Sequence, residues 1–416
     1  MQSTREPLLR ARSRVDDDDD ANRPIPLIPK KPARRTPKRP RRVRRRRWIR
    51  RALVVLIVLA TLGGGWAYAV GSRSGNENFV AKAADWFRDH HLGGVASWVE
   101  HEWYSHHAPP VGGDPSRSIT ASTVAVAPAA TPSGTHRPAL PPTVASPASP
   151  SLAHEGEWQA LVSGADGRPA VAEAQIRPDA IHTSVLGALV WIDPTQVQLV
   201  DVPGTVEPGG SWPVKGTLPP DLRSRMVAAF NGGFRFKDSH GGFYAAGRAS
   251  PPLVDGTASF VVRADGSVDV GQWGRDDRMG PDIVSVRQNL ALMIDGGHAV
   301  PGLADDSNKR WGNTLGSRVY VWRSAIGVRA DGALVYAASD GLTATSLADM
   351  LLRAGVVRAM ELDINPNWVT FNLYSHPDPN DVSVLTGSKL LPDMRRTADR
   401  YLGPDSRDFT AVLLEK

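Results

Sequence analysis

The sequence contains two acidic residues, Glu361 and Asp363, in the segment ELDINPNW at positions 361–368. In an extended strand, residues two positions apart point to the same face, so these carboxylates are predicted to lie side by side. Repulsion between the two carboxylates raises the pKa of one of them. That group can then act as an acid beside its ionised neighbour, which acts as a base. The pair can equally hold a cation, or one member can cap the following turn. A turn at 339–343, SDGLT, adds Asp340 as a further candidate carboxylate.

An arginine and two glycines are the other candidates for a role in binding or catalysis. Arg323 enters the apolar stretch VWRSAIG at 321–327, where a guanidinium is costly to bury unless it is paired. Its partner is either a structural carboxylate or an anionic ligand. In AAFNGGFR at 228–235, a strand is predicted to break at Gly232 and Gly233, so that open backbone N–H groups can approach a sugar or phosphate. A simple turn is the alternative.

Strands joined by tight turns are predicted to position these residues. Three stretches, 260–270, 292–300 and 325–336, alternate in the manner of hairpins around an Asp-Gly turn. A helix is predicted over 346–355, with Thr345 or Ser346 as its cap and Gly355 at its end. The strand 356–363 follows. Many hairpins with a few helices predict an α+β domain built on a largely antiparallel or mixed sheet, from about residue 155 to 416.

Composition excludes several classes of protein. The 416 residues include no Cys, which rules out a disulfide scaffold, an iron–sulfur site and a thiol nucleophile. The net charge of +6 is unevenly distributed. Residues 1–51 hold 19 Lys and Arg against 6 Asp and Glu, whereas the remainder holds 30 against 37. The chain is therefore a mildly acidic body with a basic tail, and no nucleic-acid partner is expected.

The basic tail, residues 1–51, is predicted to be disordered and cytoplasmic, because it has too little apolar surface to fold. Residues 52–70 carry no charge, and a helix of that length spans about 28 Å, so one transmembrane helix is predicted there. The preceding arginines are expected to stay inside and to bind anionic lipid. This makes the chain a single-pass cell-membrane protein with its C-terminal domain outside. A cleaved signal peptide is the alternative, since Ala67-Tyr68-Ala69 fits a cleavage pattern.

Two further segments separate this span from the outer domain. Residues 71–108 suggest a short amphipathic helix, and their five histidines show no regular metal-ligand spacing. Residues 109–154 are rich in Pro, Ala, Ser and Thr, a composition typical of an extended linker.

Taken in order, the motifs of the outer domain resemble the phosphodiester glycosidase family, which includes the enzyme that uncovers mannose 6-phosphate and many bacterial relatives. The matching segments are Asn231–Phe234, Arg323–Gly327, Asp340-Gly341, the helix ending at Gly355, and Leu362-Asp363. The likeness covers roughly residues 181–374. It departs after Asp363, where the family has Gly-Gly-Gly-Ser and this chain has Ile-Asn-Pro-Asn followed by Trp368.

The resemblance implies roles for particular residues. Asp363, with Glu361 or Asp340, would supply the carboxylates that stabilise or attack an oxocarbenium ion. The remaining candidates would bind substrate: a phosphate at the arginines and glycine amides, and sugar groups at the amide and indole side chains. These candidates are Arg235, Arg323, Gly232, Gly233, Asn231, Asn365 and Trp368.

The sequence therefore predicts a membrane-anchored glycosidase that cleaves a sugar from a sugar-1-phosphate diester in an envelope polymer or glycolipid. The altered loop after Asp363 favours an alternative, an inactive envelope glycan- or polymer-binding module on the same fold. A regulatory contact between the basic tail and a cytoplasmic partner is a third possibility. No cofactor or metal site is predicted, and a divalent cation is left open.

Overall fold

The computed structural model describes residues 41–72, 79, 82–83, 86–87, 90, 109–119, 140–304, 310–312, 320–378, 381 and 383–415. The predictions for residues 1–40, for most of 73–108 and for 120–139 lie outside these residues. The chain divides into two compact units, Met1–Gly64 and Gly65–Lys416. The larger unit contains all the strands described below.

Three β-sheets form the larger unit. The first has eight strands, in the order β1 (Gln159–Ser163), β2 (Pro169–Ile176), β3 (Gly187–Ile192), β14 (Leu334–Leu342), β13 (Val321–Arg329), β15 (Val356–Glu361), β11 (Leu292–Asp295) and β12 (His298–Ala299). The second has β7 (Arg248–Ala249), β6 (Phe243–Ala245), β10 (Ile283–Gln288), β8 (Ala258–Arg263) and β9 (Val268–Gln272). The third has β17 (Thr386–Lys389), β16 (Phe371–Ser375), β5 (Met226–Asn231), β18 (Phe409–Leu414) and β4 (Val197–Val202).

The predicted α+β class with a transmembrane helix was wrong. Every pairing between the described strands is antiparallel. The helices described beyond residue 140 are α4 (Pro220–Arg223), α5 (Phe236–Ser239), α6 (Ala344–Arg353) and the short 3-10 helix η2 (Arg400–Leu402). Hairpin connections leave little chain for helices, which makes the domain mostly β. The long helix near the start, α1 (Arg41–Gly71), contains the arginine cluster as well as the apolar stretch. Among the described residues, none of the helices combines the length and the apolar character needed to cross a membrane.

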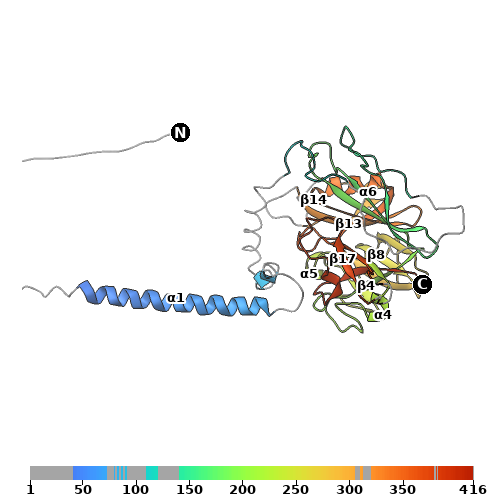
Figure 1. Ribbon diagram of the computed structural model, residues 1–416. Helices are drawn as coiled ribbons and strands as arrows, with labels where there is room; N and C mark the ends of the chain where they lie inside the picture. Colours follow the sequence, from blue (N-terminus) through green and yellow to red (C-terminus); the bar gives the residue numbers. More distant parts are fainter. Residues whose placement is uncertain are drawn as a thin grey trace, which may run out of the picture. The chain divides into compact units, whose positions relative to one another are not determined.

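The eight-stranded sheet is covered on both faces, as side-chain alternation requires. Ile326, Tyr336 and Met360 belong to the main core, which they share with residues of the other two sheets. Their neighbours on the opposite face pack with α6 in a second core: Ala325, Ala337 and Ala359. Figure 1 shows α6 beside β13 and β14. Two successive residues of one strand therefore face different surroundings.

The predicted helix exists but begins earlier than expected. Thr343 caps α6, because its hydroxyl accepts a hydrogen bond from the backbone N–H of Ser346, whose own hydroxyl accepts one from the N–H of Thr343. Gly355, just after the helix, has a φ of +81°, which a side chain would disfavour. The sequence signals for the helix end were therefore read correctly, whereas its cap was placed two or three residues too late.

Both described ends of the predicted linker lie against the domain. The N–H of Gly112 donates to the carbonyl of Ile181 at 2.7 Å, and the hydroxyl of Thr183 donates to the carbonyl of Gly113 at 2.6 Å. Farther along, Val144 is buried and its N–H donates to the carbonyl of Gly156. These stretches are part of the folded unit, although their composition is that of a linker.

A buried carboxylate connects the second and third sheets and provides a first prediction. Asp201 on β4 accepts hydrogen bonds from the hydroxyls of Ser285 and Thr410, each at 2.7 Å. Burial, helped by the nearby charge of Asp408, raises the pKa of Asp201 from 3.8 to about 6, against the effect of those hydrogen bonds. The folded state therefore prefers the protonated acid. This stabilisation is fully present below about pH 4 and is lost as the pH rises through about 6.

Replacing Asp201 with Asn is expected to raise the free energy of unfolding at pH 8 by as much as about 3 kcal/mol. The reason is that the amide stays neutral and both hydroxyls can still bond to it. Urea unfolding of the full chain at pH 5 and pH 8 measures the effect, which should be smaller at pH 5. Equal gains at both values would contradict the assignment.

Candidate functional site

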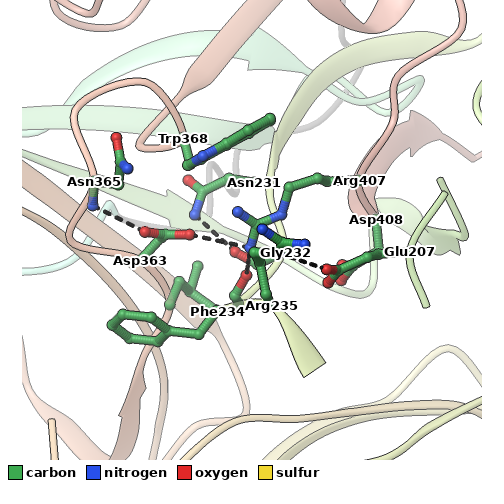
Figure 2. Close-up of polar contacts among 12 residues, drawn as sticks. Glu207, Asn231, Gly232, Phe234, Arg235, Asp363, Asn365, Trp368, Arg407 and Asp408 are labelled. Carbon is green, nitrogen blue, oxygen red and sulfur yellow. Dashed lines mark hydrogen bonds and ion pairs between the residues drawn. The ribbon is translucent and has the colours of Figure 1, made fainter. Parts of the chain in front are cut away.

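Three segments that are distant in sequence meet around the side chain of Asn231, at the end of β5 (Figure 2). Its amide nitrogen donates to the hydroxyl of Ser324 on β13 at 3.2 Å. Its amide oxygen accepts from the N–H of Thr370 and the hydroxyl of Tyr336, each at 3.1 Å. The N–H of Ser324 donates to the carbonyl of Asp363 at 2.9 Å, so Asn231 and Asp363 share one neighbour. The structure thus brings together two of the predicted residues.

The carboxylate of Asp363 contacts an arginine that precedes β18. Arg407 Nη2 lies 3.3 Å from one carboxylate oxygen, and the N–H of Asn365 donates to the other at 2.9 Å. The same guanidinium nitrogen donates to the carbonyl of Gly233 at 2.7 Å. The side chains of Asp363 and Arg407 are only 4% and 8% exposed. Arg407 therefore links the Asn-Gly-Gly-Phe segment to the candidate catalytic carboxylate.

A second guanidinium lies next to this cluster. Arg235 Nε donates to Glu207 at 2.8 Å, and the other carboxylate oxygen of Glu207 accepts from the N–H of Phe236 at 3.1 Å. Burial opposes ionisation of Glu207, but the charges of Arg407 and Arg235 outweigh it and hold the pKa of that carboxyl below its usual value. Two arginines and an ionised glutamate thus surround the glycine turn.

Gly232 and Gly233 lie where a side chain would collide with neighbouring side chains. A Cβ on Gly232 would lie 2.1 Å from the carboxylate of Asp408, and one on Gly233 would lie 2.7 Å from the side chain of Asn289. The N–H of Gly232 already donates to the carbonyl of Asp408, and that of Phe234 to Asn289 Oδ1. The N–H groups of Gly232 and Phe234 therefore already have acceptors within the chain and are not open to a phosphate.

Arg323 and Glu361 lie on the other face of the eight-stranded sheet. Arg323 Nη1 lies 2.6 Å from Glu361 Oε1, and both side chains are 1% exposed or less. Arg323 also donates to the carbonyls of Trp311 and Leu342. Of the two partners predicted for Arg323, a structural carboxylate or an anionic ligand, the structure shows the carboxylate.

Glu361 and Asp363 have different arginine partners, Arg323 for Glu361 and Arg407 for Asp363. The strand β15 ends at Glu361, so alternation no longer governs the direction of Asp363. Ser324, the neighbour of Arg323, contacts Asn231 because successive strand residues point to opposite faces.

The remaining predicted residues are Asp340, Asn365 and Trp368, and only Asn365 contacts the Asp363 carboxylate, through its backbone N–H. Asp340 lines a separate cavity together with Tyr320 and Asp393. Asn365 forms a turn, since its side-chain oxygen accepts from the N–H of Asn367. Trp368 is 3% exposed, and its ring lies beneath guanidinium groups, that of Arg407 being 4.6 Å from the ring centre. Its indole is thus a support for the arginines rather than an open sugar platform.

Sequence reasoning missed Ser324, Arg407, Glu207 and Asn289. Ser324 follows Arg323 in the sequence, and strand alternation already implied that the two side chains point to opposite faces of the sheet. The others lie in segments without a motif, so only the three-dimensional fold brings them to the site.

Asn289 is a buried clamp between the two halves of the site. Its Oδ1 accepts from the N–H of Phe234 at 3.1 Å, and its Nδ2 donates to the carbonyls of Glu361 and Leu362 at 2.5 and 3.0 Å. Replacing Asn289 with Ala removes the hydrogen bonds that its side chain makes to these three backbone groups. The expected loss is about 2–4 kcal/mol of unfolding free energy, measured in urea. Asn289→Asp keeps the acceptor but sets a buried carboxylate oxygen against the two carbonyls, so at neutral pH its loss should be at least as large as that of Asn289→Ala. Equal stability of all three proteins would contradict the clamp.

Within the part of the chain that the structure describes, no three His, Asp or Glu side chains are grouped so that they could hold a metal ion.

Comparison with known proteins supports the resemblance inferred from the motifs. Residues 224–363 match the family model for phosphodiester glycosidase. Among solved structures, the chain is similar to the catalytic domain of zebrafish N-acetylglucosamine-1-phosphodiester alpha-N-acetylglucosaminidase, described as auto-inhibited by its pro-peptide, with 20% identity, a TM-score of 0.38, and coverage of 62% of this chain and 88% of that one. It is also similar to a hypothetical protein from Synechocystis, with 13% identity, a TM-score of 0.35, and coverage of 64% and 65%. No curated protein matches.

Proposed function

We propose, on the premise that residues 224–363 match the family model for phosphodiester glycosidase, that the chain hydrolyses sugar-1-phosphate diesters of an envelope polymer or glycolipid, outside the cytoplasm. The observation that carries the proposal is the contact of Asp363 with Arg407, which also binds the carbonyl of Gly233. It joins a carboxylate suited to an oxocarbenium ion with a guanidinium suited to a phosphate.

The reaction needs one bond to break at the anomeric carbon. The C1–O bond is cleaved, and the bonding electrons leave with the phosphate, which departs as a phosphomonoester. Water supplies the hydroxyl that bonds to C1, and its proton passes to Asp363 or to solvent. Phosphate is a good leaving group, so a second carboxylate acting as a strong acid is not required. This fits a site in which Glu361 is bound to Arg323 on the other face of the sheet.

Each charged group near Asp363 has a role in this proposal. Asp363 stabilises positive charge as it develops at C1, and Arg407 and Arg235 attract the phosphate. Asn231 supports the site from behind, since its amide is already bonded to Ser324, Thr370 and Tyr336. Substrate phosphate would compete with Asp363 and Glu207 for the two guanidinium groups.

A release assay with the full chain tests the proposal. Sugar-1-phosphate methyl diesters with different sugars are incubated with the protein, and the free reducing sugar is measured. At least one diester is expected to be cleaved, and the matching aryl glycoside without phosphate should react at least about 100-fold more slowly, because it cannot use the guanidinium groups. Arg407→Ala is expected to remove most of the preference for phosphate, whereas Arg353→Ala, at an exposed pair on α6, should not.

The alternative is an inactive glycan- or polymer-binding module. The low exposure of Asp363 and its contacts with Arg407 and the N–H of Asn365 favour it, because the carboxylate is already engaged. If the wild-type chain binds the diesters but releases no more sugar than Asp363→Asn, binding is the function and the hydrolase proposal fails.

A further inference from the structure

Three guanidinium groups gather around the buried ring of Trp368. Those of Arg407, Arg400 and Arg396 lie over the ring, at 4.6, 5.0 and 5.6 Å from its centre. Trp368 is 3% exposed, and all three arginines are buried as well. An aromatic face attracts a cation, and the attraction is stronger where water is excluded. The ring therefore helps the fold to hold three positive charges in one buried place.

Arg400 is fixed by other parts of the chain. Its Nε donates to Asp405 Oδ2 at 2.7 Å, and its Nη1 donates to the hydroxyl of Thr370 at 2.7 Å and to the carbonyl of Trp368 at 3.2 Å. Asp405 also accepts a hydrogen bond from the backbone N–H of Arg407 at 2.9 Å. Trp368 is thus connected to Arg407 twice, directly through its ring and indirectly through Arg400 and Asp405.

The guanidinium of Arg407 is held by hydrogen bonds at one nitrogen. Its Nη2 contacts both the carbonyl of Gly233 and the carboxylate of Asp363, whereas its Nε and Nη1 donate to none of the described residues. A planar group held at one nitrogen can turn about that point. The Trp368 ring lies against the same guanidinium and limits this rotation (Figure 2). The ring thus sets the direction in which the other N–H groups of Arg407 point.

The turn that carries Trp368 also holds the carboxylate of Asp363. The N–H of Asn365 donates to Asp363 Oδ1 at 2.9 Å, and the N–H of Trp368 donates to the carbonyl of Asn365 at 2.8 Å. One short turn therefore contacts the carboxylate at its beginning and places the ring against Arg407 at its end. The spacing between carboxylate and guanidinium depends on this turn.

We propose that Trp368 is a positioning residue that gives the site its preference for phosphate, because its ring orients the Arg407 guanidinium beside Asp363. The inference rests on the proposed function. Trp368 does not touch the substrate; it acts through Arg407. A side chain without a ring leaves the guanidinium able to turn about Nη2, so a bound phosphate loses the N–H groups at Nε and Nη1.

The test measures the preference for phosphate, defined as kcat/KM for the methyl diester that the release assay identifies divided by kcat/KM for the matching aryl glycoside. Trp368→Leu is expected to lower this ratio at least about tenfold, whereas Trp368→Phe keeps a ring and should stay within about threefold of wild type. Trp368→Met is a second variant without a ring, in case Trp368→Leu does not fold. Equal losses on both substrates would show a purely structural role and overturn the proposal.

Two controls show whether Trp368 acts through Arg407. Trp273→Leu truncates a tryptophan that is 6% exposed and packs in a separate cluster with residues of the second sheet, and it should leave the ratio unchanged. The double variant Trp368→Leu/Arg407→Ala should have the same ratio as Arg407→Ala alone. A further drop in the double variant would show that the ring acts on the substrate by another route and would contradict the proposal.

A stability measurement separates failure of this inference from failure of the proposed function. Urea unfolding of wild type, Trp368→Leu, Arg407→Ala and the double variant gives the coupling between the two side chains and needs no turnover. A coupling of at least about threefold in the unfolding equilibrium constant is expected. Sugar release with additive stabilities and an unchanged ratio would overturn the positioning role and leave the hydrolase intact. Coupling without sugar release by wild type would defeat the hydrolase, and the positioning role with it.

Discussion

Asp363→Asn is expected to lower kcat for sugar-phosphodiester hydrolysis about 10³-fold or more, with a small change in KM. The amide keeps the shape of the side chain and can still accept from the N–H of Asn365, but it has no charge to stabilise an oxocarbenium ion. Release of reducing sugar under single-turnover conditions measures the effect.

Two controls make this result interpretable. Asp349→Asn removes a carboxylate from an exposed ion pair and should leave kcat unchanged. Urea unfolding should show that Asp363→Asn is folded, although the loss of its contact with Arg407 costs some stability. Wild-type turnover in a folded Asp363→Asn protein would show that another group supplies the carboxylate chemistry.

Breaking the buried ion pair between Arg323 and Glu361 is expected to have the largest effect on stability. Arg323→Met removes the arginine partner of the Glu361 carboxylate, whose side chain is 0% exposed. This change should lower the free energy of unfolding by about 3–5 kcal/mol. The double variant Arg323→Met/Glu361→Leu removes both charges and should recover most of that loss, because neither charge then remains desolvated.

Urea unfolding of the four proteins in this cycle gives the coupling energy directly. Strong coupling is the expected result for a structural salt bridge. If the two single changes were additive and mild, while sugar-phosphate binding fell sharply in Arg323→Met, the arginine would instead belong to a ligand site.

The hairpins were the part of the fold most accessible to prediction. The stretch 325–336 alternates around Asp331-Gly332, and the structure pairs β13 with β14 at this turn, where Gly332 has a φ of +84°. A local requirement for positive φ is readable from a dipeptide. The arrangement of the strands into three sheets depends on contacts between distant segments, and no short pattern reports those.

The site was accessible only in part, for a related reason. The motif around Asn231 and the rim position of Asp363 could be read from short segments, and the structure brings both residues to Ser324. Glu361 was expected to share a face with Asp363 because the strand was predicted to reach residue 363, whereas β15 ends at Glu361 and the Glu361 carboxylate is paired with Arg323. Arg407 could not be found, since its importance comes from the place of β18 between β4 and β5.

The position of β18 between β4 and β5 has a consequence for folding during synthesis on the ribosome. β4 and β5 both pair with β18, which is made after every other described strand. Until residues 405–414 have left the exit tunnel, the third sheet lacks the strand that joins β4 to β5, and Asp363 lacks the Arg407 guanidinium that contacts it. The centre around Asp363 therefore assembles only after β18 has emerged from the ribosome.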